Sequence, residues 1–229
     1  MTDGPGDTRE LAVVELLGAL TYGQLRAFEV TARAVRFAPD VRTAERLASF
    51  ALREHEGWAV LRGALTERTD LGAAVLERQK PRFDAFFDAM PVDDWLGATL
   101  FFSVGLPIAA DFVRQLAPSL DPDVALVVVG ALADRGPFEQ FALDAVRRIL
   151  AGADDEEAAR ARHLVADVLG RALTGFQEAL GDTDALKVLL ADAAGREDVP
   201  PESHVKRVAI TVLEGHRRRM HALGLEDLD

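Results

Sequence analysis

Carboxylates and one histidine lie where two neighbouring helices of the chain could hold a metal ion. Glu29 belongs to the first predicted helix, and the run Arg53-Glu54-His55-Glu56 belongs to the helix after it. Carboxylate oxygens and imidazole nitrogens are the ligands that iron takes in four-helix bundles. We expect Leu11 to Leu65 to fold as an antiparallel helical hairpin, which would bring these side chains toward one interior. Their placement therefore suggests a metal-binding four-helix bundle.

Each of these residues also has an ordinary structural interpretation. Glu29 lies at the edge of its apolar stripe, where a boundary glutamate paired with an arginine is common. Glu54 falls inside an apolar stripe, and a buried carboxylate is costly without a partner. An ion pair of Glu54 with Arg26 or Arg33 is the favoured interpretation, and a ligand in shifted register is the alternative. His55 suits a hydrogen-bonded helix histidine as well as a metal ligand.

The first hairpin is predicted from helix caps and apolar spacing. Asp7 and Glu10 form a capping-box pattern before the first helix, and Pro39-Asp40 ends that helix and caps the next. A second apolar edge on the second helix (Ala48, Leu52, Ala59) indicates that this helix is central. The predicted stripes are Val14, Leu17, Thr21, Leu25, Phe28, Ala32 and Val35, then Leu47, Ala51, Glu54, Trp58, Leu61 and Leu65.

Prolines divide the middle of the chain. Two short pieces, Leu71–Arg78 and Arg82–Met90, are predicted on either side of Pro81, as a connection between two hairpins. A long helix from about Val92 to Leu116 follows, with a kink at Pro107.

The next segment is less regular. Asp121-Pro122 starts a helix whose run Val124–Ala133 is apolar on every side; a buried strand is the alternative. Gly136-Pro137 is expected to interrupt it before Phe138–Leu150 resumes a helical pattern.

The remaining chain is also predicted to be helical, over Glu156–Leu180, Thr183–Ala194 and Glu202–Leu223. The fold class is therefore all-α, a four-helix bundle with additional C-terminal helices. We expect one domain over residues 1–229, with the core bundle at about 8–152 and the C-terminal helices at about 154–223.

Composition excludes several classes of function. The net charge of −12 makes nucleic acid an unfavourable partner, because the mean field repels phosphates. The chain has no cysteine, which excludes disulfides and cysteine-ligated metals. Trp95 to Ala110 is uncharged over 16 residues, but a membrane span needs about 20, so a buried core helix is favoured and no membrane is expected. The first residues lack a signal-peptide pattern, which predicts a cytoplasmic protein.

Several short motifs together carry a resemblance. They are Gln24-Leu25-Arg26-Ala27-Phe28-Glu29, Arg53-Glu54-His55, the segment from Gly105 to Phe112, Leu132-Ala133-Asp134, and the segment from His216 to Leu225. With these motifs the chain resembles an actinobacterial group of ferritin-like proteins that is itself similar to MiaE-type tRNA hydroxylases, which are non-haem di-iron oxygenases. The resemblance implies a ferritin-like bundle and, in its complete form, a di-iron site.

The ligand set implied by the resemblance is incomplete in its first half. A di-iron bundle uses one glutamate from each of two helices and Glu-x-x-His from each of the other two. Glu29 matches the first-helix glutamate. His55 matches the first histidine, but Leu52 stands at the paired glutamate and offers no ligand atom.

The second half is incomplete too. Asp111 matches the third-helix carboxylate, and Asp134 replaces the second motif's glutamate. Pro137 stands where the second histidine should be. Asp111 is also compatible with an ordinary boundary carboxylate, and for Asp134 capping or ion pairing near a helix break is the favoured role.

Two hypotheses about function follow. In the favoured one the protein is a scaffold with a degenerate di-iron site, so its cofactor is none or iron, and it binds an unknown protein or small-molecule partner, with a homodimer as one arrangement. In the alternative it is an active di-iron hydroxylase in which Glu54, Glu56 or Glu139 supplies ligands in shifted register. Whether it is an enzyme is left open. The histidines His216 and His221 are five apart and do not share a helix face, which disfavours a zinc site there.

Overall fold

A computed structural model describes residues 5–132, 135–182 and 184–225, and all regular structure in these ranges is helical. The all-α prediction is confirmed. The helices are α1 (Pro5–Ala34), η1 (Val35–Phe37), α2 (Val41–Arg68), α3 (Gly72–Asp88), α4 (Trp95–Leu100), η2 (Phe101–Gly105), α5 (Leu106–Leu116), η3 (Ala117–Ser119), α6 (Pro122–Leu132), α7 (Arg135–Gly152), α8 (Asp155–Asp182), α9 (Asp184–Arg196) and α10 (Pro201–Leu223).

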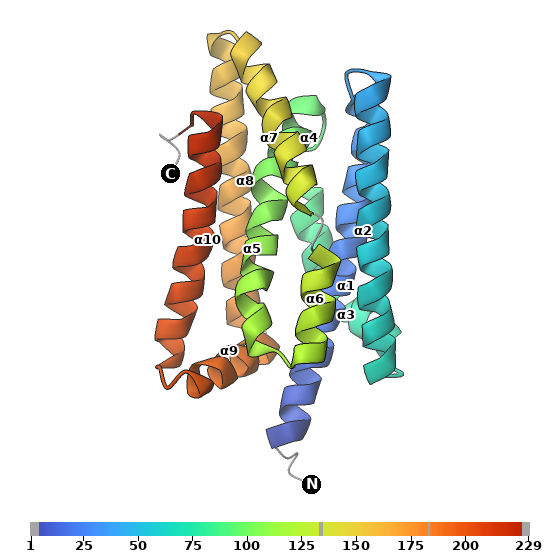
Figure 1. Ribbon diagram of the computed structural model, residues 1–229, viewed down its shortest axis with the longest axis vertical. Helices are drawn as coiled ribbons and strands as arrows, with labels where there is room; N and C mark the ends of the chain where they lie inside the picture. Colours follow the sequence, from blue (N-terminus) through green and yellow to red (C-terminus); the bar gives the residue numbers. More distant parts are fainter. Residues whose placement is uncertain (1–4, 133–134, 183, 226–229) are drawn as a thin grey trace.

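The helices lie nearly along one axis, apart from α9, which crosses the end of the bundle (Figure 1). The α1–α2 hairpin and α3 form one side, α8 and α10 the other, and α4 to α7 lie between them. The C-terminal helix α10 packs against α5, α7 and α9.

The α1–α2 hairpin is confirmed, with corrections to the start of α1 and to the buried faces of both helices. Asp40 caps α2 as predicted, because its carboxylate accepts a hydrogen bond of 2.8 Å from the Thr43 amide. However, α1 already begins at Pro5, so position 7 lies inside the helix and is not its N-cap position. A proline is well suited to the first helical position, where its missing N–H is no loss.

The buried face of α1 differs from the predicted stripe beyond Thr21. The side chains at Gln24, Ala27, Val30 and Ala34 are buried, whereas the predicted positions at 25, 28, 32 and 35 are partly or fully exposed. The stripe therefore continues by steps of three from Thr21 and passes through a polar residue. A prediction that assigns only apolar residues to the buried stripe misses Gln24. Its amide can be buried because it forms hydrogen bonds inside the bundle.

On α2 the predicted stripe is confirmed, and Trp58 is its only partly exposed member. The proposed second apolar edge is wrong, because Ala48, Leu52 and Ala59 are exposed and the side chain of Leu52 retains 63% of its accessible surface. The helix thus buries one face and lies at the edge of the bundle. This fixes which side of α2 faces the interior.

Pro81 does not divide α3, which is one helix from Gly72 to Asp88. A proline inside a helix leaves the carbonyl four residues earlier without its donor. Here that carbonyl belongs to Glu77, and both Glu77 and Pro81 are exposed, so water can satisfy it. The two predicted pieces are therefore continuous.

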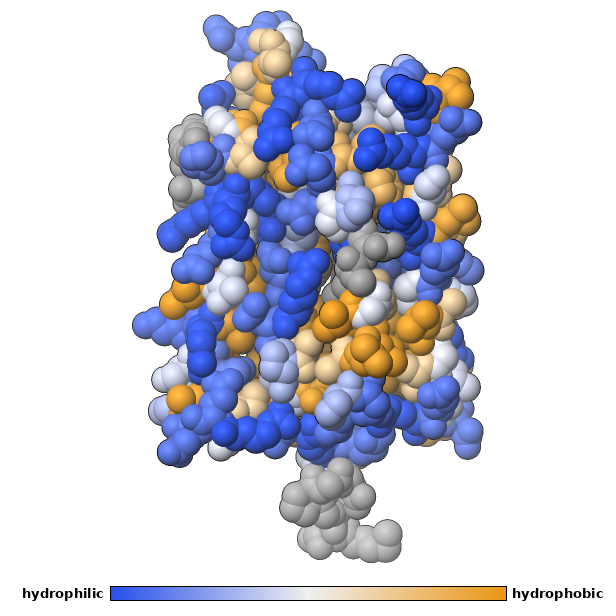
Figure 2. Space-filling model, in the orientation of Figure 1, coloured by the Kyte–Doolittle hydropathy of each residue, from blue (hydrophilic) through white to orange (hydrophobic). Residues whose placement is uncertain are grey.

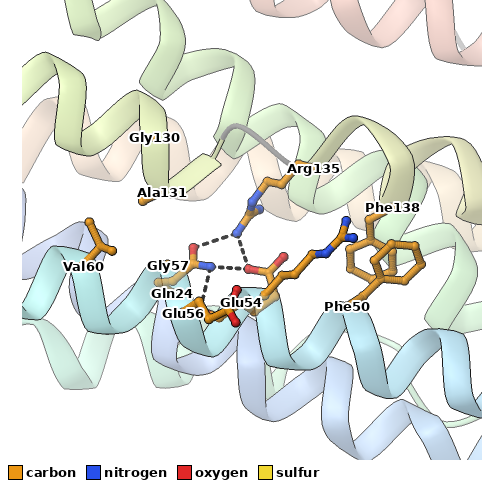
Figure 3. A pocket seen from close by; sticks show the side chains of 11 residues that line it. Gln24, Phe50, Glu54, Glu56, Gly57, Val60, Gly130, Ala131, Arg135 and Phe138 are labelled. Atoms are coloured by element: carbon orange, nitrogen blue, oxygen red, sulfur yellow. Dashed lines mark hydrogen bonds and ion pairs between the residues drawn. The ribbon is translucent and has the colours of Figure 1, made fainter.

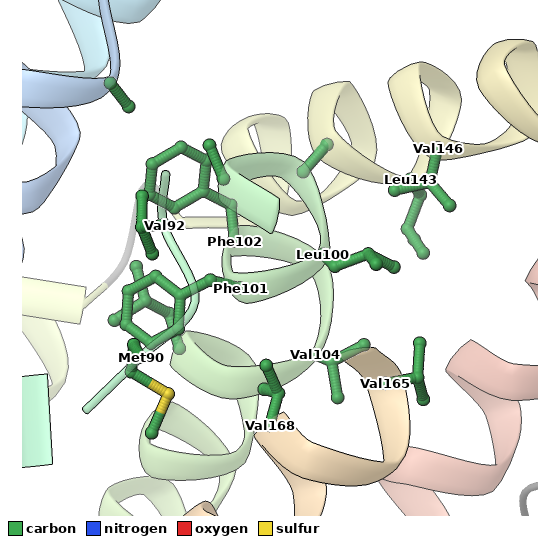
Figure 4. Packing of buried hydrophobic residues seen from close by; sticks show 14 of the residues in the cluster. Met90, Val92, Leu100, Phe101, Phe102, Val104, Leu143, Val146, Val165 and Val168 are labelled. Carbon is green, nitrogen blue, oxygen red and sulfur yellow. The ribbon is translucent and has the colours of Figure 1, made fainter. Parts of the chain in front are cut away.

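The long apolar helix forms the centre of the core. It begins at Trp95, capped by Asp94, and widens into the π-helical turn η2 before Pro107, where a kink was expected. Figure 4 shows Phe101 and Phe102 of this turn packed among side chains from the neighbouring helices. In the described chain, Trp95–Ser119 is the one helix long and apolar enough to cross a membrane, and 83% of its window is buried inside the protein, as expected of a core helix.

The apolar run that starts at Pro122 is a helix, which was the interpretation favoured over a buried strand. It is not buried on every side, because Leu126 and Val129 are exposed, and an apolar surface lies over α6 in Figure 2. The next helix, α7, begins at Arg135, so Gly136 and Pro137 belong to its first turn, where backbone N–H groups have no intrahelical partner. The chain thus forms two helices, α6 and α7, as predicted, but Gly136 and Pro137 lie within the second of them.

Candidate functional site

A buried polar cluster joins α1, α2 and α7 (Figure 3). Its members are Gln24, Glu54 and Arg135, and the side chains of Gln24 and Glu54 retain 5% and 4% of their accessible surface. Arg135 Nη2 lies 2.6 Å from Glu54 Oε2 and 2.7 Å from Gln24 Oε1. Gln24 Nε2 donates to the backbone carbonyl of Glu54 at 3.1 Å and also to Glu54 Oε2. Three helices are thus connected through one carboxylate.

The cluster explains why a glutamate can occupy an apolar stripe. A carboxylate taken out of water is costly unless a cation and hydrogen-bond donors replace the lost water. Arg135 supplies the cation, and Gln24 supplies an amide donor. The prediction that Glu54 forms an ion pair is therefore confirmed, but its partner is Arg135 and not one of the two predicted arginines. Arg26 and Arg33 instead pair with Glu29.

A cavity of about 310 Å³ lies beside this cluster. Arg53 and Glu56 of α2 and Phe138 of α7 contribute to its lining. Gly57 and Ala131 bring α2 and α6 close together: a Cβ added at Gly57 would lie 2.9 Å from the Ala131 carbonyl oxygen. A side chain at position 57 would therefore crowd this contact between the two helices.

Comparison with known families identifies the architecture. The model of a ferritin-like domain of actinomycetes matches residues 7–193. The chain belongs to this family. No curated protein matches the chain. The predicted ferritin-like bundle is thereby confirmed.

In this ferritin-like protein the cluster is buried in the interior, and the ligands of a di-iron bundle also project into the interior. Such a site takes a glutamate from one helix and Glu-x-x-His from the next. The inward positions here carry Gln24 on α1, Glu54 and Gly57 on α2, and Arg135 and Phe138 on α7. The pair Glu54 and Gly57 has the i, i+3 spacing of a Glu-x-x-His motif, and so has the pair Arg135 and Phe138. However, the first pair offers one carboxylate and no second side chain, and the second pair offers a guanidinium and a phenyl ring. Gln24 offers an amide in place of a carboxylate. These residues do not fit a di-iron centre.

Glu29 and His55 lie away from this interior. Glu29 is 3.6 Å from both Arg26 and Arg33, and its side chain is 40% exposed, in line with the boundary-glutamate interpretation. His55 is exposed and lies between aromatic rings, 5.4 Å from Phe28 and 5.2 Å from Trp58 between ring centroids. Neither side chain shares a site with Glu54.

Asp111 lies in a second ionic cluster. It accepts hydrogen bonds from Arg114 at 2.9 Å and from Arg219 of α10 at 2.8 Å, and Arg219 lies 3.6 Å from Glu139. Burial raises the pKa of the Glu139 carboxyl; Arg219 opposes this rise and Asp111 adds to it. Asp134 lies outside the described residues.

The predicted ligands that the structure describes, Glu29, Glu54, His55 and Asp111, are thus not brought together into one metal site. Among residues 5–132, 135–182 and 184–225, no three His, Asp or Glu side chains gather as a metal site requires. The metal-binding role of Glu29, His55, Asp111, Asp134 and Glu54 stays a prediction, and the contacts of the described residues do not support it.

Sequence reasoning missed Gln24, Arg135 and Arg219. Gln24 could have been found by continuing from Thr21 in steps of three, because Ala27 and Val30 follow in the same pattern. Arg135 was hidden by the neighbouring Gly136-Pro137, which looked like the end of a helix. For Arg219, a member of a run of three arginines, the sequence offers no signal that one of them is only 6% exposed.

Proposed function

We propose that this ferritin-like protein is a metal-independent binding scaffold in which a guanidinium replaces the metal ions of a di-iron bundle. The observation that carries the proposal is the contact between Arg135 and Glu54 at 2.6 Å. The arginine supplies, as a fixed cation, the positive charge that the buried carboxylate needs. The bundle then keeps its interior connections without a cofactor.

The chemistry of the side chains supports this substitution. A metal ion at Glu54 would have to displace Arg135 and leave a largely buried guanidinium without its carboxylate, and an uncompensated buried charge is strongly destabilising. Gln24 provides only one neutral oxygen, and that oxygen already accepts from Arg135. Iron in oxygen-activating sites prefers anionic carboxylates and imidazole.

The likeness to MiaE-type hydroxylases motivates the alternative, an active di-iron hydroxylase, but the shifted ligands it needs do not converge. Glu56 is exposed at the rim of the cavity, whereas Glu139 belongs to the Asp111–Arg219 cluster. We therefore propose that di-iron oxygen chemistry is not retained.

The remaining parts of the proposal concern context. We propose one domain over the whole chain, because α10 packs against α5 and α7 of the bundle. The net charge of −12 favours a protein or small-molecule partner over nucleic acid. A cytoplasmic location and a homodimer stay predictions.

Oxygen consumption tests the proposal. The purified chain is mixed anaerobically with Fe(II) and then exposed to air, and the uptake of dioxygen is compared with that of Fe(II) in buffer alone. We expect equal rates. A faster rate that is lost in the Glu54→Gln variant would support the hydroxylase alternative instead.

A further inference from the structure

A groove of about 710 Å³ runs along the bundle, apart from the Gln24–Glu54–Arg135 cluster. Residues of α1 and α3 line one side, residues of α5 and α8 line the other, and α9 contributes at one end. The lining includes the buried side chains of Leu16 and Ile108 and the half-buried rings of Phe83, Phe86 and Phe112. Apolar rings that remain half in water are a surface that a ligand could cover with a gain in free energy.

The shape of the groove indicates what could fill it. Its lining residues on α8 extend from Ala166 to Glu178, which at 1.5 Å per residue is about 18 Å. An α-helix of that length, with a diameter of about 10 Å, occupies roughly 1,400 Å³, about twice the available volume. The groove therefore cannot enclose a partner helix, which would leave much of its surface outside.

An extended peptide is also a poor occupant. The walls are helices, whose backbone N–H and C=O groups already bond within each helix. A peptide in the groove would lose water from its own backbone and find few partners in return. A hydrocarbon has no hydrogen bonds to water that it would lose in the groove. The apolar lining and the volume of the groove therefore favour a hydrocarbon.

We propose that this groove binds an elongated hydrocarbon chain, of the acyl or isoprenoid type. Small residues give the groove its depth, among them Ala85, Ala109 and Gly170. At Gly170 an added Cβ would meet nothing within 4 Å, so packing inside the protein does not require glycine there. Because Gly170 lines the groove, the space above it is where a bound chain would lie.

The rim of the groove carries charges of both signs. Arg171 donates to Asp167 at 3.0 Å, and Gln79 links the rim residues Glu15 and Arg82 by donating to the first at 2.8 Å and accepting from the second at 3.0 Å. Because these charges interact along the rim, neither sign dominates. The chain of the ligand, more than its head group, then supplies the binding free energy.

The inference rests on the proposed binding role, for which it names a ligand class. Its lining shares no residue with the cavity beside Glu54, so the two proposals fail separately. Iron binding together with hydrocarbon binding would contradict only the metal-independent role. Absence of both would contradict only the groove.

Displacement of a fluorescent fatty acid tests the groove. The full chain, stripped of lipid, is titrated with cis-parinaric acid, and hexadecanoate, hexadecanol and octanoate then compete. We expect saturable binding, similar displacement by hexadecanoate and hexadecanol, and at least about 100-fold weaker displacement by octanoate, because each buried methylene contributes. Failure of the probe to saturate, or equal competition by octanoate, would overturn the proposal.

Two matched variants locate the site. Gly170→Leu should fill the groove and weaken probe binding at least about tenfold, because a leucine side chain takes up space the ligand needs. Gly63→Leu is the control, since Gly63 is also an exposed helical glycine with nothing within 4 Å of an added Cβ, but it lies on α2 outside the groove. Circular dichroism checks that both variants fold. Wild-type affinity in a folded Gly170→Leu protein would place binding elsewhere.

Discussion

Arg135 and Glu54 are 81 residues apart in the sequence and 2.6 Å apart in the fold. Their contact joins the first turn of α7 to the middle of α2, and Gln24 of α1 completes it. Because all three side chains point toward one interior (Figure 3), they fix the register of three helices relative to one another. An ion pair and hydrogen bonds connect the three helices at this point.

Removing one partner of this pair should destabilise the fold far more than removing both. We expect Arg135→Met or Glu54→Leu alone to cost about 3–5 kcal/mol, because each leaves an unpaired buried charge. The double variant should recover most of this loss. Urea denaturation of the four proteins measures the coupling, and strictly additive losses would contradict a direct interaction.

Two glycines of α2 should respond to alanine with opposite signs. At Gly57 a Cβ would crowd the Ala131 carbonyl and the Gln24 amide, at 2.9 and 3.0 Å. We expect Gly57→Ala to cost about 1–3 kcal/mol by overpacking. At Gly63 nothing lies within 4 Å, so Gly63→Ala should stabilise by about 0.5–1 kcal/mol through helix propensity. Equal responses in thermal denaturation would show that α2 and α6 are not in close contact.

The Asp111–Arg219–Glu139 cluster should make stability depend on pH. Burial raises the pKa of Glu139 above its ordinary 4.5, so the folded state holds this proton to a higher pH than the unfolded state does. Its contribution to the free energy of unfolding is then largest in acid and falls as the pH rises through the raised pKa. Relative to the wild type, Glu139→Gln should therefore gain stability as the pH rises from the ordinary 4.5 through the raised pKa. A difference that stays constant over this range would contradict the raised pKa.

Restoring a glutamate at the position implied by the family resemblance should not create a metal ligand. Leu52 is 63% exposed, so Leu52→Glu should change stability by no more than about 0.5 kcal/mol and should add no bound iron. Leu47→Glu is the contrasting variant, because Leu47 is fully buried and an unpaired carboxylate there should unfold the protein. Iron uptake by Leu52→Glu would mean that α2 turns its other face inward.

Periodicity predicted most of the helices, because spacing and caps are local properties of the chain. Asp40 illustrates this: its cap depends on a residue only three positions away. The errors came where local rules meet a tertiary environment. Pro81 was expected to break a helix, but its exposed position lets water satisfy the freed carbonyl.

The candidate site was predictable only in part. The inward direction of Glu54 follows from the stripe of α2, and so does its need for a partner. The identity of that partner depends on how α7 lies across α2, which no local pattern encodes. The register taken from the resemblance placed the first Glu-x-x-His motif at positions 52 and 55, where Leu52 replaces the glutamate, and both positions lie on the exposed face of the helix.

The iron content of the chain tests the central claim most directly. The protein is produced in iron-rich medium, purified without chelators and analysed by elemental mass spectrometry, beside a known di-iron protein treated identically. Because the inward carboxylate of Glu54 is already paired with Arg135, we predict less than about 0.1 iron per chain. About two irons per chain, lost in the Glu54→Gln variant, would contradict the account.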